Sequence, residues 1–144
     1  LVGRIFMQPA DCPFKAASAA LAELSRQTRI IIVDIHAEAT SEKLAMGWHL
    51  DGKVSAVFGT HTHVQTADER VLPGGTAYIT DIGMAGGHDS ILGRRTQAVL
   101  KKFITNIPEP FDVASGDPRM CGAVITIDPS TGKAEGIERV VIRP

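Results

Sequence analysis

Two histidines stand one residue apart in the segment VFGTHTHVQTAD, where an apolar run ends. If this segment stays extended, His61 and His63 project from one face of the chain, because side chains two residues apart share a face. Such a pair suits metal ligation, although surface strands also carry polar residues at alternate positions. The spacing alone leaves both interpretations open.

A third histidine, His36, ends the run IIIVDIH just as the pair ends SAVFGTH. In open α/β sheets, ligand-binding and catalytic groups collect beyond the carboxyl ends of strands. Neutral imidazole is a ligand for Zn, Mn and Fe. We therefore predict that His36, His61 and His63 converge within about 5 Å of one point around a metal ion. The alternative is a hydrogen-bonded core histidine at position 36 and a surface pair.

The types and positions of the other polar residues indicate their roles less specifically. Asp34 either orients a ligating histidine through its second ring N–H or is a buried aspartate bonded to the backbone or to a Lys or Arg. Glu38 is either a ligand or a surface acid, and the surface acid is favoured. His49 is predicted to be a surface or packing residue. His88, in the Gly-rich loop AGGHDS, is more typical of a loop residue than of a substrate contact, and the preceding GMAGG lacks the Gly-Lys-Ser/Thr ending of a P-loop.

The elements that position these residues follow from hydrophobic periodicity and turn residues. The pattern predicts helices over 13–27, 40–52 and 94–108, strands over 29–38, 53–61 and 76–86, and a β-hairpin over 121–144. The short Ile/Val block of the first strand predicts burial on both of its faces. Thr40 or Ser41 can cap the second helix, and Gly52 can end it.

The first two strands and the helix between them form a β–helix–β unit. Such a short unit normally joins parallel strands by a right-handed crossover. We therefore predict that runs 30–35 and 56–58 are neighbouring parallel strands. The helix should pack across them through Leu44 and Trp48.

Composition excludes several classes of function. The chain has 144 residues, a net charge of −1, 44% hydrophobic and 22% charged residues, which is ordinary for one globular domain. No Lys/Arg run predicts binding to long nucleic acid, although a single nucleotide remains a candidate substrate. No apolar stretch approaches the roughly 20 residues that span a bilayer, and no signal peptide is visible. Cys12 and Cys121 lie outside any C-x-x-C pair, which favours free thiols over a disulfide and predicts a cytoplasmic protein.

Three longer motifs, HAEATSEK, GTHTHVQTAD and GTAYITDIGM, are together highly specific. They resemble the YmdB-like metallophosphoesterases, a branch of the calcineurin-like superfamily. The resemblance runs from GRIFM near the start to the closing GKAEGIERVVI. It implies an α/β fold: the C-terminal half of a two-sheet (αββα) sandwich, with a mixed sheet and a final β-hairpin.

The resemblance also implies an activity. Members of the family are phosphodiesterases that act on cyclic nucleotides, including 2′,3′-cyclic ones, with two divalent ions (Fe, Mn or Zn) at the strand ends. By position, His36 and His61 resemble ligands of one ion, and His63 resembles a ligand of the other. Two ions about 3.5–4 Å apart can bind both the phosphoryl oxygens and the attacking hydroxide.

The sequence departs from the family pattern in one respect. The family's other ligands and its catalytic histidine come from an N-terminal half with G-D, G-E-N and G-N-H motifs. GEN and GNH do not occur here, and GD occurs only in SGDP at 115–118. Since the chain also starts on a strand-like run without Met, we expect residues 1–144 to be a single domain that is a fragment of a larger metallophosphoesterase domain.

This expectation sets the predicted partners. They are a small phosphodiester or cyclic nucleotide and the missing N-terminal half, with no membrane, while a homo-oligomer is left open. The catalytic histidine belongs to the missing half, so we predict no catalytic residue here. The isolated chain should be inactive and bind one metal ion weakly at most. The alternative is a non-catalytic metal-binding or assembly module.

Overall fold

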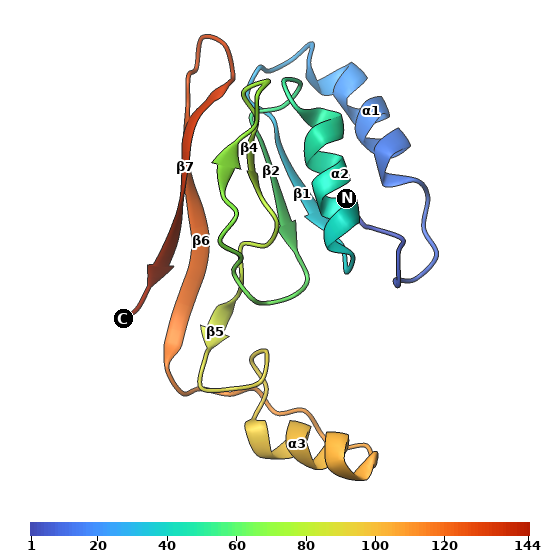
Figure 1. The fold of residues 1–144 in the computed structure, drawn as a ribbon, viewed down its shortest axis with the longest axis vertical. Coiled ribbons are helices and arrows are strands. Elements are labelled where there is room, and N and C mark those ends of the chain that lie inside the picture. The colour runs from blue at the N-terminus through green and yellow to red at the C-terminus, as the bar shows by residue number, and fades with distance from the viewer.

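The computed structural model describes residues 1–144, which form three helices and seven strands in two sheets (Figure 1). The helices are α1 (Pro13–Leu24), α2 (Thr40–Leu50) and α3 (Thr96–Thr105). The mixed sheet, in the order β1-β2-β4-β3, contains β1 (Ile32–His36), β2 (Ala56–Thr60), β4 (Ala77–Ile79) and β3 (Arg70–Val71). The antiparallel sheet contains β5 (Ala85–Gly87), β6 (Pro118–Ile127) and β7 (Ala134–Ile142). The predicted α/β class, with a mixed sheet and a final hairpin, is confirmed.

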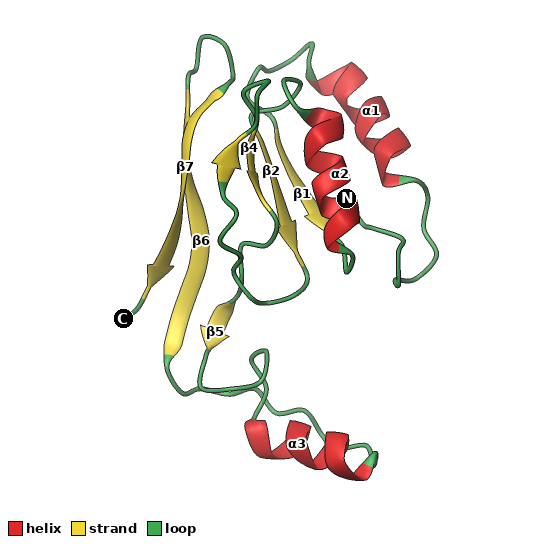
Figure 2. Ribbon diagram, in the orientation of Figure 1, coloured by secondary structure: helices red, strands yellow, loops and turns green.

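Helices α1 and α2 cover one face of the mixed sheet, and the β6–β7 hairpin packs on the other face over β2, β4 and β3, which leaves that face of β1 exposed (Figure 2). The core under the helices is built from Ile35, Met46, Leu50, Val57 and Tyr78, all of them buried. Burial raises the pKa of Tyr78 to about 12, so its hydroxyl stays neutral at physiological pH.

The hairpin meets the sheet through small side chains. Ala56 and Ala77 of the sheet pack against Ala134, with Ile125 and Ile137 around them. Because alanine side chains are short, the two sheets approach closely at this point, and the N–H of Ala134 donates to the carbonyl of Gly75 at 2.8 Å.

The predicted β–helix–β unit is confirmed, because β1 and β2 are parallel neighbours in register from Ile32↔Ala56 to His36↔Thr60. The predicted packing of α2 is half wrong. Leu44 contacts the core, but Trp48 is 53% exposed and lies beside Arg70. The buried face runs through Met46 and Leu50, which lie four residues apart and therefore share a face.

Three other local predictions are wrong. The first strand is not buried on both faces, since Ile32 is 53% exposed at the free edge of the sheet. The predicted strand over 76–86 is two strands in different sheets, because the chain leaves the mixed sheet after Ile79 and turns at Gly83, where φ is 83°. The N-cap of α2 is Ala39, which makes no capping side-chain hydrogen bond.

The predicted third helix is confirmed as α3, which lies apart from α1 and α2 at the far end of the molecule (Figure 1). Of its apolar stripe, only Val99 is buried. Cys12 and Cys121 are free thiols, as predicted. None of the helices has the length and apolar content that a bilayer crossing needs.

Gly59 of β2 permits the closest backbone approach in the sheet. A Cβ at this position would stand 1.8 Å from the carbonyl oxygen of Thr80 and 2.7 Å from Cδ of Lys43. We expect Gly59→Ala to lower the free energy of unfolding by about 3 kcal/mol, the upper range for overpacking, because the backbone of Thr80 must move. Urea unfolding measures this change.

Gly136 of β7 provides the matched control, because a Cβ there would meet no atom within 4 Å. Gly136→Ala should leave the unfolding midpoint unchanged or raise it. Equal midpoints for the two variants would contradict the close approach at Gly59.

Candidate metal centre

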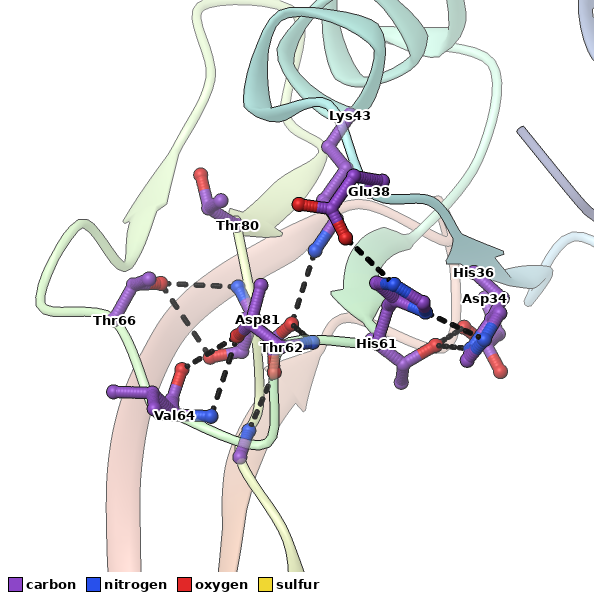
Figure 3. A network of polar contacts seen from close by, with 12 residues as sticks. Asp34, His36, Glu38, Lys43, His61, Thr62, Val64, Thr66, Thr80 and Asp81 are labelled. Carbon is purple, nitrogen blue, oxygen red and sulfur yellow. Dashed lines mark hydrogen bonds and ion pairs between the residues drawn. The ribbon is translucent and has the colours of Figure 1, made fainter. Parts of the chain in front are cut away.

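His36 and His61 meet at the carboxyl ends of β1 and β2. His36 is the last residue of β1 and is in register with Thr60, the last residue of β2. Nδ1 of His61 lies 3.1 Å from Nε2 of His36, and the two rings are nearly perpendicular, with an interplanar angle of 86° (Figure 3). The structure therefore brings together two of the three predicted ligands.

The chain bends sharply through the histidine pair. His61 has φ of 107° and His63 has φ of 64°, values that residues with a Cβ seldom adopt. The segment is therefore not extended, and the condition under which both imidazoles would project from one face is not met. His61 turns toward His36, whereas Nδ1 of His63 lies 3.2 Å from the carbonyl oxygen of Leu92. Such backbone strain persists only where the surrounding structure enforces it, often at functional sites.

His63 is hydrogen-bonded to the carbonyl of Leu92, whereas His36 and His61 contact each other. The chain contains no group of three or more His, Cys, Asp or Glu side chains arranged to hold a metal ion. The convergence of all three histidines on one point stays a prediction.

Thr60 sets the tautomer of His36. Its Oγ1 donates to Oδ1 of Asp34 at 3.0 Å and lies 3.0 Å from Nδ1 of His36 (Figure 3). Because the hydroxyl has only one hydrogen, it must accept from His36, so Nδ1 carries the proton and Nε2 presents a lone pair. Asp34 therefore orients the histidine through Thr60 rather than directly. The sequence argument did not single out Thr60, although it directly precedes His61.

Glu38 contributes a carboxylate that the sequence argument placed on the surface. Its Oε2 lies 2.7 Å from Nε2 of His61, although its side chain is 50% exposed. Glu38 follows His36 by two residues, so spacing offered a signal. The sequence left both a ligand and a surface acid open at this position, and the structure shows a half-exposed carboxylate that contacts His61.

A buried ion pair supports the loop that carries the histidines. Nζ of Lys43 lies 3.0 Å from Oδ2 of Asp81, and neither side chain is exposed to solvent. Asp81 also accepts from the backbone N–H of Thr62 at 3.0 Å and from that of Gly83 at 2.9 Å (Figure 3). The carboxylate thus positions the residue between the two histidines. Sequence reasoning missed this pair, because Lys43 resembles any charged residue of an amphipathic helix.

Asp68 supports the same loop from farther out. Burial opposes ionisation of this carboxyl, but hydrogen bonds from Thr66 and Thr80 outweigh burial and lower its pKa below the ordinary value. Thr66 donates to Asp68 at 2.6 Å, and the N–H of Asp81 donates to Oγ1 of Thr66 at 3.0 Å. The ionised carboxylate therefore stabilises the segment that follows the histidines.

His49 and His88 lie away from the side chains around His36 and His61. His49 packs between α1 and α2, with Nε2 3.2 Å from Oγ of Ser18 and its ring edge-on to Phe14, which confirms the predicted packing role. His88 follows β5, with Nε2 3.5 Å from Sγ of Cys121.

His36 and His61 have the spacing of two ligands of one divalent ion, and no third His, Cys, Asp or Glu side chain completes the group. Metal–nitrogen bonds of about 2.0–2.1 Å place two nitrogens of one coordination shell roughly 3 Å apart, which agrees with the His36–His61 separation of 3.1 Å. Glu38 contacts the other ring nitrogen of His61, Nε2, so its carboxylate holds the His61 ring from the side away from His36. Imidazole nitrogens suit Zn, Mn or Fe. For a second ion these residues offer only His63, so a metal pair requires further ligands.

The segments around this centre match a known family over almost the whole chain, since residues 1–140 match the YmdB-like protein family. The chain belongs to the YmdB-like family. A Bacillus subtilis relative named 2′,3′-cyclic-nucleotide 2′-phosphodiesterase is 56% identical over 142 residues, which cover 99% of this chain and 54% of that protein.

Two solved structures share the fold of this YmdB-like chain. A hypothetical protein from Thermus thermophilus superposes with a TM-score of 0.92 at 43% identity, covering 99% of this chain and 55% of that one. A structure described as a novel phosphatase from Mycoplasma pneumoniae gives a TM-score of 0.88 at 37% identity, covering 99% and 51%. The YmdB-like chain thus spans about half the length of the proteins it matches.

Proposed function

We propose that the protein is a metal-dependent phosphodiesterase that hydrolyses phosphodiesters such as 2′,3′-cyclic nucleotides. The observation that carries this proposal is the contact between His36 and His61 at the ends of adjacent parallel strands, with the His36 lone pair directed at its neighbour. The 56% identity to a protein named for cyclic-nucleotide hydrolysis supports the same conclusion.

In this proposal the histidines divide between two divalent ions (Fe, Mn or Zn). His36 and His61 bind one ion, with the Glu38 carboxylate next to them, and His63 binds the other. When bound, such ions polarise the phosphoryl group and activate water. Thr60 keeps His36 in the tautomer that can bind, and Asp81 positions the loop between His61 and His63.

We also propose that residues 1–144 are one part of a larger metallophosphoesterase domain, whose other part supplies the remaining ligands and the acid that protonates the leaving group. The chain spans 54% of the Bacillus subtilis relative, and its residues contain no group of three or more His, Cys, Asp or Glu side chains that could hold a metal ion, which supports this division. The free thiols of Cys12 and Cys121 support a cytoplasmic location, where cysteines stay reduced.

Metal removal and reconstitution test the proposed function. The protein as its gene encodes it is stripped with a chelator, reloaded with Mn²⁺, Zn²⁺ or Fe²⁺, and assayed on 2′,3′-cyclic AMP. Hydrolysis should disappear with the metal and return with it. If the reloaded protein binds metal but does not hydrolyse 2′,3′-cyclic AMP or simpler phosphodiesters, it is the non-catalytic metal-binding or assembly module instead.

Residues 1–144 expressed alone should hydrolyse bis-p-nitrophenyl phosphate no faster than a His61→Ala/His63→Ala control. Three neutral imidazoles and one half-exposed carboxylate do not offset the charge of two divalent ions. These residues also provide no evident acid for the leaving oxygen, a role worth roughly 10²- to 10⁴-fold. Calorimetric metal titration should show one weak site at most. Robust metal-dependent hydrolysis that the substitutions abolish would contradict this prediction.

A further inference from the structure

A cavity of about 320 Å³ lies directly beside His63. Its walls come from the loop after β2, the segments on either side of β5, and the strands β6 and β7. His63 belongs both to the candidate metal centre and to the lining of this cavity. A molecule in the cavity would therefore reach the side of the metal centre at which His63 stands.

One part of the cavity wall is apolar. Val64, Leu92 and Val141 line it, and each leaves about half of its surface exposed. A bare phosphate or a metal ion gains nothing from such a wall, whereas a flat aromatic ring buries apolar area against it. The wall therefore favours an organic group over an inorganic ion.

The polar part of the wall presents groups whose orientation is fixed from outside the cavity. Nε2 of Gln65 donates to the carbonyls of Gly122 at 2.8 Å and Val140 at 3.3 Å, so the amide oxygen is left as an acceptor. Arg119 pairs through Nη2 with Asp117, while its Nε–H is buried and has no hydrogen-bond partner. The Arg119 side chain as a whole is 30% exposed and lines the cavity, so its guanidinium offers donors to a ligand there.

The imidazole ring of His88 also lines the cavity and is held in one orientation by contacts within the chain. Its Nδ1 lies 3.0 Å from the carbonyl oxygen of Gly86, so Nδ1 donates there, and Nε2 faces Sγ of Cys121 at 3.5 Å. Both ring nitrogens are occupied within the chain, and the ring therefore contributes shape to the cavity.

We propose that this cavity binds the nucleobase of the substrate whose phosphodiester reacts at the metal centre. The inference rests on the proposed function and names its substrate class. A base combines a flat apolar face with hydrogen-bond donors and acceptors on its edge, which matches the apolar wall, the Gln65 oxygen and the Arg119 guanidinium. Arg119 and Gln65 are then residues that determine specificity.

Two substrates that differ in the nucleoside test this inference in the protein as its gene encodes it. For Arg119→Met, kcat/KM on 2′,3′-cyclic AMP should fall about tenfold, as expected for losing a hydrogen bond to a charged group. The same variant should keep its kcat/KM on ribose 2′,3′-cyclic phosphate, which has the same reacting group and no aromatic ring. Arg95→Met is the matched control, since Arg95 forms an exposed ion pair with Asp112 and does not line the cavity. It should change neither value.

Val141→Trp tests the cavity without disturbing the Arg119–Asp117 pair. The larger side chain fills the space beside β7 and should raise KM for 2′,3′-cyclic AMP while leaving KM for ribose 2′,3′-cyclic phosphate unchanged. The inference would be overturned if kcat/KM fell equally on both substrates, or if neither variant lowered kcat/KM on 2′,3′-cyclic AMP. If the unmodified protein cleaves neither substrate, the proposed function fails, and binding is then judged by thiol protection.

Thiol protection detects occupancy without any hydrolysis. Cys121 lines the cavity, whereas Cys12 stands at the start of α1 and serves as an internal reference. The backbone N–H of Lys15 lowers the pKa of the Cys12 thiol, so Cys12 carries more thiolate and reacts readily. Saturating adenosine or guanosine should slow the alkylation of Cys121 by iodoacetamide severalfold and leave Cys12 unchanged. Unchanged rates at Cys121 with both nucleosides would refute the pocket.

Discussion

In the protein as its gene encodes it, replacing His61 with alanine is expected to lower kcat/KM for 2′,3′-cyclic AMP by more than about 100-fold, because the loss of even an outer-shell partner of a metal ligand costs 10- to 100-fold. His61 is the residue that contacts both His36 and Glu38, at 3.1 Å and 2.7 Å. Its removal takes away one of the two adjacent histidine ligands of the proposed site and leaves Glu38 without its partner. Steady-state kinetics and metal content per protein, measured on the same preparation, check this result.

The control for this variant is His49→Ala, which removes a histidine that packs between α1 and α2. It should leave both metal content and kcat/KM unchanged. Thr60→Val is an intermediate case, because it retains every proposed ligand and removes the hydroxyl that orients His36. We expect a loss of about 10- to 100-fold for it. A His61→Ala protein that retains full metal content and rate would contradict the proposed site.

Asp81→Asn should lower the free energy of unfolding by about 3–5 kcal/mol, the usual cost of removing one partner of a buried ion pair. Both side chains of the Lys43–Asp81 pair are fully buried, so the substitution leaves the lysine charge without compensation. The variant should also loosen the His61–His63 loop, because Asp81 accepts from the N–H of Thr62. Urea unfolding of the variant and the parent protein gives the difference.

The double variant Lys43→Met/Asp81→Asn tests whether the two buried charges interact. It should be more stable than Asp81→Asn alone, because no unpaired charge stays in the core. Asp112→Asn is the matched surface control, since its partner Arg95 is largely exposed, and it should cost less than about 1 kcal/mol. A double variant as unstable as the sum of its single variants would show that the two charges do not interact.

The sequence was sufficient for the parts of this protein that depend on local patterns. Apolar periodicity predicted α1, α2, α3 and the final hairpin, and the short β–helix–β unit predicted that β1 and β2 are parallel. Parallel neighbours end at one edge of their sheet, which is why His36 and His61 were expected to meet and do so. The motifs around them were specific enough to indicate the family.

Tertiary structure decided how the side chains of the centre are directed. The positive φ values of His61 and His63 direct one imidazole to His36 and the other to Leu92, and an extended segment would have placed them together. This bend depends on the carboxylate of Asp81, held by a lysine 38 residues earlier in the chain.

Hydrogen bonding between distant residues likewise assigned the roles of Thr60 and Glu38. Periodicity reports which face of an element is buried, and these contacts arise between elements. The sequence therefore determined which strands end together and which residue types follow them. Only the folded chain determined which donors point at one another, because that choice depends on backbone dihedrals and buried partners far away in sequence.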